Sequence, residues 1–133
     1  MSITDMHHHT KALAGLTLQT LTTGTVTGEI IDTAGFNSLE FALLSSTITD
    51  GAFVVSLLHG NDSGLSDVTA VSAAETLGDA DYADTDDDTA NRIGYIGKKR
   101  YVQLNIVATG ATTGGDFAGI AVLGNAAHMP TAD

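Results

Sequence analysis

Residues 100–108 have the sequence Arg-Tyr-Val-Gln-Leu-Asn-Ile-Val-Ala, in which polar and apolar side chains alternate. Successive side chains of a β-strand point to opposite faces, so this period of two predicts a strand with one buried face. The side chains expected in the core are the apolar ones, Val102, Leu104 and Ile106. The side chains expected on the outside are the polar ones, Tyr101, Gln103 and Asn105.

Short segments rich in Thr, Val, Ile and Leu recur on both sides of this stretch, and turn residues separate them. This composition is typical of strands. Gly28, inside one of these segments, predicts a bulge or a close approach of backbone. We expect turns at residues 33–37, 49–51, 97–99 and 110–115, the last two as hairpin turns. The other expected strands span residues 16–22, 25–32, 38–45, 52–60, 92–97 and 117–123.

About seven strands at spacings of about ten residues predict an all-β, single-domain β-sandwich or jelly-roll-like barrel. The 133 residues suffice for one domain with its own core. We expect residues 1–15 to form an extended N-terminal arm, residues 16–124 the β-sandwich domain and residues 125–133 a polar C-terminal tail. Residues 68–77 allow one or two helical turns, with Val68, Val71 and Ala74 facing inward. We expect neither a membrane span nor a signal peptide.

Charge is distributed very unevenly along the chain. The net charge is −11, and three of the five basic residues are Lys98, Lys99 and Arg100, with Arg92 just upstream. Residues 79–88 contain six Asp in ten positions. So acidic a chain does not bind nucleic acid generically, because phosphate contacts need a broad basic face. The basic block is either a solvated turn or a docking point for an acidic neighbour, such as residues 79–88 of another copy.

No pattern in the sequence indicates catalysis or a cofactor. The acidic stretch could bind Ca²⁺, but it departs from an EF-hand because Ala90 stands where the loop needs Glu. The alternative is a solvated loop, mobile unless a cation or a basic surface neutralises it. His59 is expected in a turn, and no Ser lies in a Gly-x-Ser-x-Gly elbow. We therefore expect a protein that is not an enzyme and holds no cofactor.

Several motifs along nearly the whole chain resemble small virion structural proteins of tailed bacteriophages. The most specific is Arg-Ile-Gly-Tyr-Ile-Gly-Lys-Lys-Arg-Tyr-Val at residues 92–102. The others are Asp5-Met6-His7, Ile-Thr-Asp-Gly at 48–51, His-Gly-Asn-Asp at 59–62, the closing run at 119–124 and the tail at 126–130. Such proteins are typically encoded beside the major capsid protein. The resemblance implies a head decoration (cement) protein, made in the host cytoplasm and located on the outer capsid surface.

This resemblance implies two partners, the major capsid protein and other copies of the chain, and we expect a homotrimer at three-fold positions of the shell. Neither nucleic acid nor a membrane is expected as a partner. The N-terminal arm and the basic hairpin would make the contacts. The candidate interface residues are Met6, His7, Lys11, Arg92, Lys98, Lys99, Arg100 and Tyr101. Two alternatives remain open: a tail or head-tail connector subunit, and a Ca²⁺-dependent glycan-binding module that uses Asp79–Asp88.

Overall fold

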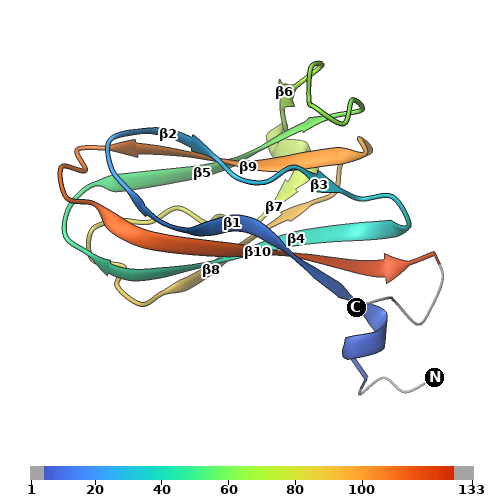
Figure 1. Ribbon diagram of the computed structural model, residues 1–133, viewed down its shortest axis with the longest axis horizontal. Helices are drawn as coiled ribbons and strands as arrows, with labels where there is room; N and C mark the ends of the chain where they lie inside the picture. The colour runs from blue at the N-terminus through green and yellow to red at the C-terminus, as the bar shows by residue number, and fades with distance from the viewer. Residues whose placement is uncertain (1–4, 128–133) are drawn as a thin grey trace.

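The computed structural model describes residues 5–127, and strands make up most of it (Figure 1). Two short 3-10 helices, η1 at His7–His9 and η2 at Ala73–Glu75, are the helical segments in this range. The strands are β1 (Lys11–Leu21), β2 (Gly24–Thr27), β3 (Ile31–Asp32), β4 (Phe36–Ile48), β5 (Ala52–Gly60), β6 (Thr69–Ala70), β7 (Thr76–Leu77), β8 (Ala90–Tyr95), β9 (Tyr101–Thr109) and β10 (Gly115–Ala126). Within the described residues no helix is long and apolar enough to cross a membrane.

Two antiparallel sheets pack face to face. The first sheet has the strand order β1-β10-β4-β8-β7, and the second has the order β2-β9-β5-β6, with β3 also paired to β9. The first long strand pairs with the last, β1 with β10, and each later pair lies closer to the middle of the sequence: β2–β9, then β4–β8, then β5–β6. A hairpin ribbon wrapped around a core in this way is a jelly roll. The predicted all-β sandwich is therefore confirmed.

The core lies between the sheets and follows the predicted alternation. Val102, Leu104 and Ile106 of β9 are buried, whereas the side chains between them face outward. Two of the largest buried rings meet between the sheets, where the centroids of Phe53 and Phe117 are 4.7 Å apart. Aromatic burial of this kind supplies much of the stabilisation of a small sandwich.

The first strand starts earlier than expected, because β1 begins at Lys11 and pairs with β10 from that residue onward. Residues 11–15 thus lie in the sheet, and the described part of the expected arm is the short segment 5–10. The expected strand 25–32 is divided at Gly28, whose N–H donates to the carbonyl of Leu104 at 2.9 Å. A Cβ at Gly28 would lie 2.1 Å from the Gly15 oxygen, so the predicted close approach is confirmed.

Both predicted hairpin turns near the C-terminus are wrong. Residues 96–100 connect β8 of the first sheet to β9 of the second, and residues 110–114 connect β9 back to β10 of the first. Each segment crosses the end of the sandwich instead of joining neighbouring strands. Gly and polar residues break a strand equally well in either case, so the local signal does not distinguish a crossing from a hairpin.

The expected helical turns in residues 68–77 shrink to η2, between the two-residue strands β6 and β7. Val71 packs against the core as predicted, but Val68 and Ala74 are exposed. At the C-terminal side, Asn125 and Ala126 belong to β10 and not to a tail. The remaining tail, residues 128–133, and the first four residues of the arm lie outside the described part of the chain.

Candidate functional site: the basic end of the sandwich

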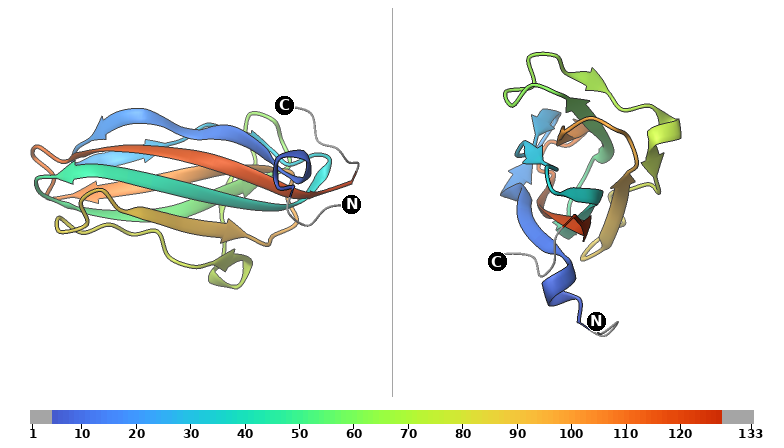
Figure 2. Two further views of the ribbon diagram at one scale, coloured as in Figure 1. Left: turned by 90° about the horizontal axis from the view of Figure 1, so that it is seen from below. Right: turned by 90° about the vertical axis from the view of Figure 1, so that its right-hand side faces the viewer.

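The register of the first sheet places the N-terminal segment and the basic block at one end of the molecule. Lys11 pairs with Leu123, Leu123 with Leu39, and Leu39 with Tyr95, so these four residues form one row across the sheet. The connections 33–35, 61–68 and 96–100 close this end, which the right-hand view of Figure 2 faces. We call it the basic end, defined by Lys11, Lys98, Lys99 and Arg100.

A buried hydrogen-bond chain holds the basic block in place. Nδ1 of His59, on β5, lies 2.8 Å from the hydroxyl of Tyr95, and both side chains are buried. The backbone N–H of Lys99 donates to the same hydroxyl oxygen at 2.9 Å. Burial raises the pKa of Tyr95, which keeps its hydroxyl protonated. His59 was expected in a turn; it instead anchors the loop from inside the second sheet.

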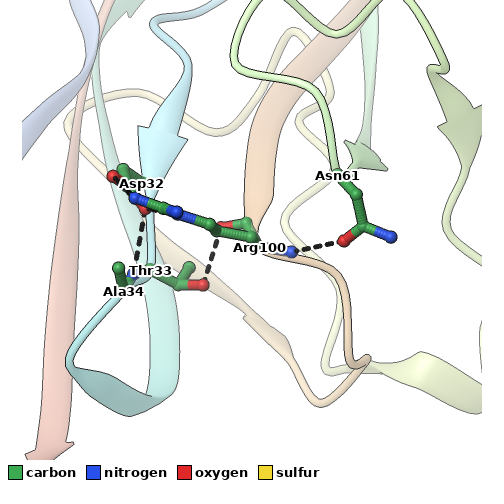
Figure 3. A network of polar contacts seen from close by, with 5 residues as sticks. All are labelled: Asp32, Thr33, Ala34, Asn61 and Arg100. Atoms are coloured by element: carbon green, nitrogen blue, oxygen red, sulfur yellow. Dashed lines mark hydrogen bonds and ion pairs between the residues drawn. The ribbon is translucent and has the colours of Figure 1, made fainter.

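Arg100 is held on the opposite side of the loop (Figure 3). Its guanidinium group contacts both carboxylate oxygens of Asp32, at 2.8 and 2.9 Å, and its backbone N–H donates to Asn61 Oδ1 at 3.2 Å. The N–H and hydroxyl of Thr33 both donate to the Arg100 carbonyl, at 2.9 and 2.6 Å. Hydrogen bonding to Arg100 is the main cause that lowers the pKa of Asp32. Arg100 therefore serves the fold and is not a free docking charge.

Lys98 and Lys99 remain as the available cations. Neither forms an ion pair with a residue of the described chain, and Lys98 is exposed. They border an open groove of about 410 Å³. Its other lining comes from residues 33–39, Asn61, Tyr95, Gly97 and Arg100. Two lysines on a fixed loop beside a groove suit an acidic protein segment, because carboxylates can approach them without displacing an internal partner.

The other predicted interface residues lie at three different places. Met6 and His7 are exposed in the segment before β1, at the basic end but on the β1 edge of the sheet. Tyr101 begins β9, and the Arg100 guanidinium lies 5.1 Å from its ring centroid. Arg92 lies away from this end, on the outer face of the first sheet, 3.5 Å from a Glu40 oxygen. The structure thus brings seven of the eight residues to the basic end and excludes Arg92.

The acidic segment starts beside β8, near Arg92, and runs to the opposite end of the sandwich. Its carboxylates accept backbone N–H groups of β4, of β5 and of the segment itself. Asp81 accepts the N–H of Val55, Asp86 that of Ala83 and Asp87 that of Ile48, each at 2.7 Å. Tyr82 is buried between these residues, and its ring packs on Phe117. Most residues of the segment are exposed, as expected for a solvated loop, but Ala80 and Tyr82 are buried and were not expected to be. No group of acidic or His residues in the described chain is arranged to hold a metal ion.

Sequence reasoning missed Asp32, Thr33 and Asn61, which fix the basic block from two other connections. The available signal was weak: each is a short polar residue at or just beyond the end of a strand, where such side chains commonly bond to backbone. Their common partner, Arg100, could not be inferred, because the contacts span 39 to 68 residues of sequence.

Comparison with known proteins identifies the fold and not a family. No protein-family model matches the sequence, and no curated protein matches it. Solved structures do match. The PBSX exported protein XepA superimposes with a TM-score of 0.56 at 13% identity, over 92% of this chain and 39% of that one.

Two further structures are assemblies. The infectious bursal disease virus, Gx strain, matches with a TM-score of 0.53 at 16% identity, over 91% of this chain and 33% of the viral one. The Bacillus endospore appendages, described as disulfide-linked pili, match with a TM-score of 0.51 at 13% identity, over 86% of both chains. The chain spans well under half the length of the first two proteins. At these identities the likeness shows a shared fold alone.

Proposed function

We propose that this chain is a structural protein of a phage virion, which decorates the outer surface of the capsid shell by binding the major capsid protein. The observation that carries the proposal is the basic end: neither Lys98 nor Lys99 forms a salt bridge within the described chain, and both stand on a loop that buried hydrogen bonds hold in place. A fixed loop loses little conformational entropy on binding, so its charges act at full effect. The proposed partner surface on the capsid protein is acidic.

Two other features support a structural role. The motif at residues 92–102 that resembles phage decoration proteins is the segment that forms this loop. The N-terminal segment emerges at the same end, about three strand spacings or roughly 14 Å from β8, so one copy can make two separate contacts. Linked weak contacts repeated over a symmetric shell give strong overall attachment. Such a protein needs no catalytic residue.

The test uses capsids that lack this protein and the purified chain. We expect the chain to bind in hundreds of copies on the outer shell, located and counted by cryo-electron microscopy, and bound capsids to resist heat and low salt better than bare ones. If only a few copies bound, in a ring at the portal or along the tail, the chain would be a tail or connector subunit and not a decoration protein. Equal resistance of bare and bound capsids would remove the stabilising role.

A matched pair of variants tests the basic end itself. Lys98→Gln with Lys99→Gln makes the chain two units more negative, and we expect capsid binding to fall and to lose most of its salt dependence. Thr25→Asp with Thr109→Asp makes the same change in net charge at exposed positions towards the acidic end. The control should bind normally. Equal loss in both variants would mean that total charge, and not this loop, determines binding.

A further inference from the structure

The outer face of the first sheet is apolar at its centre. Leu44 of β4 and Ile120 of β10 are 56% and 50% exposed there. Around them lie further small or apolar side chains, namely Ala12, Ala14, Leu18, Ala42, Ala90, Ala118 and Val122. The left-hand view of Figure 2 shows this sheet in front, and no described strand crosses it. These side chains do not contribute to the hydrophobic core, because the core is formed by the residues on the inner face of the sheet.

The opposite outer face is built differently. On the second sheet, Asn105 donates to the hydroxyl of Ser56 and Gln103 donates to the carbonyl of Gly28, so hydrogen-bonded polar side chains lie between the exposed Val54 and the other apolar side chains of β9 and β5. The first sheet carries few charges. They are the paired Glu40 and Arg92, and Asp116 near the end of the sheet. Glu40 and Arg92 lie among these side chains, beside Val122 and Ala42, but they pair with each other. In a chain with 16 acidic residues, a sheet face with no net charge at its centre indicates a surface that another molecule covers.

The pattern on this face is complementary to itself. The register places Ile120 beside Ala42 and Ala118 beside Leu44, so large and small side chains alternate both along and across the strands. A second copy turned over about a two-fold axis in the plane of the face sets Ile120 and Leu44 each against a small side chain. With the axis across the strands, Ile120 lies over Ala118 of the second copy and Leu44 over its Ala42. An isologous interface requires this kind of self-matching.

Charge selects between the possible two-fold axes. Residues 82–88, Asp50 and Asp116 make one end of the sandwich strongly acidic. At the other end Lys98, Lys99 and Arg100 are accompanied by Asp32, Asp62, Asp67 and Glu75, so its charges nearly balance. An axis along the strands would place the two acidic ends side by side. An axis across the strands keeps the two acidic ends apart and places each beside the nearly neutral end of the other copy. We propose that two copies of this chain pair through the outer face of the first sheet, with their long axes antiparallel.

The available area fits a specific but modest interface. Four strands at about 4.8 Å spacing and about 30 Å of strand length give roughly 600 Å² per copy, or about 1,200 Å² in total. That total lies at the lower limit of stable, specific interfaces, which bury about 1,200–2,000 Å². Two such sheets pack about 10 Å apart, as in the sandwich itself. The pair would replace the trimer expected from the sequence, because a three-fold ring joins two different surfaces of each copy.

Sedimentation velocity of the full chain over a range of concentrations tests the pairing. We expect the wild type to form dimers, and Leu44→Asp to raise the dissociation constant on the order of 100-fold or more, because each interface would bury two unpaired carboxylates. Val54→Asp is the matched control, since Val54 is 52% exposed on the outer face of the second sheet. A monomeric or trimeric wild type, or equal effects of the two variants, would overturn the proposal.

Cross-linking tests the antiparallel orientation. The chain contains no Cys, so introduced thiols are unambiguous. Ala12 pairs with Val122 and Thr20 with Asp116, two positions that the proposed axis exchanges. In a mixture of isotopically labelled Ala12→Cys and unlabelled Thr20→Cys chains, a short bis-maleimide should join unlike copies. Products that join only like copies, or no product from the dimer, would contradict the arrangement. Neither experiment depends on the capsid-binding proposal.

Discussion

The hydroxyl group of Tyr95 holds the loop that carries Lys98 and Lys99 in place. Its oxygen accepts the N–H of Lys99, and the same hydroxyl lies 2.8 Å from Nδ1 of His59, within hydrogen-bond distance. Tyr95→Phe removes both bonds and leaves two buried polar groups unpaired. We expect a loss of about 1–3 kcal/mol in the free energy of unfolding, measured by denaturant titration. Tyr101→Phe, whose ring lies at the surface beside Arg100, should change stability little, and an equal loss would contradict this assignment.

The Asp32–Arg100 pair gives stability a defined pH dependence. The pKa of Asp32 is lowered by hydrogen bonding to Arg100, so the folded state favours the carboxylate. The stabilisation is therefore complete above the unfolded pKa, about 3.9, and is lost as pH falls through the lower folded pKa. Because both side chains are about half exposed, the pair contributes about 1 kcal/mol or less. The difference in melting temperature between wild type and Asp32→Asn should shrink steadily from pH 6 to pH 2; a constant difference would contradict this.

At the scale of elements, carboxylates of the acidic segment accept backbone N–H groups of β4 and β5. Asp87 accepts the N–H of Ile48, the last residue of β4, at 2.7 Å. Asp87→Ala should cost about 1 kcal/mol, because this charge-assisted bond is lost while water replaces it in part. Asp84→Ala, at an exposed residue of the same segment, is the control and should cost nothing measurable. Thermal melts decide between this arrangement and a calcium site, for which added Ca²⁺ would raise the melting temperature of the wild type.

Strand positions could be predicted here, but strand partners could not. β5 has the expected bounds, and β9 has the expected inner and outer faces, because alternation is a property of neighbouring residues. Whether the connections after β8 and β9 turn back or cross the core depends on where the rest of the chain packs. The same limit applies to the site: the cluster of Lys98 and Lys99 is visible in the sequence, whereas its anchors on β3 and β5 depend on pairing between distant strands.

For single residues, too, the sequence predicts what depends on the residue itself and not what depends on distant contacts. Lys98 could be selected from its charge alone, and it does lie exposed. Arg100 has the same charge but is committed to Asp32, 68 positions away. Tyr82, in a stretch that composition assigns to solvent, is buried because the loop around it bonds to β4 and β5. Composition therefore predicts which residues can act, and only the fold determines which of them are free to do so.

The molecule concentrates uncompensated negative charge at one end of its long axis, and this concentration has a cost in the folded state. The end that carries residues 82–88 contains no Lys or Arg from the described chain, so its carboxylates repel one another. Asp84→Lys should raise the free energy of unfolding by a few tenths to about 1 kcal/mol at low salt, and the gain should fade above about 0.5 M salt as screening shortens the range of repulsion. The measurement is made in chains that also carry Leu44→Asp, so that pairing between copies does not contribute to the measured stability. Glu29→Lys changes the net charge equally at an exposed position beside Gly15. We expect a smaller gain there; equal gains at both positions would mean that total charge, and not its placement, determines stability.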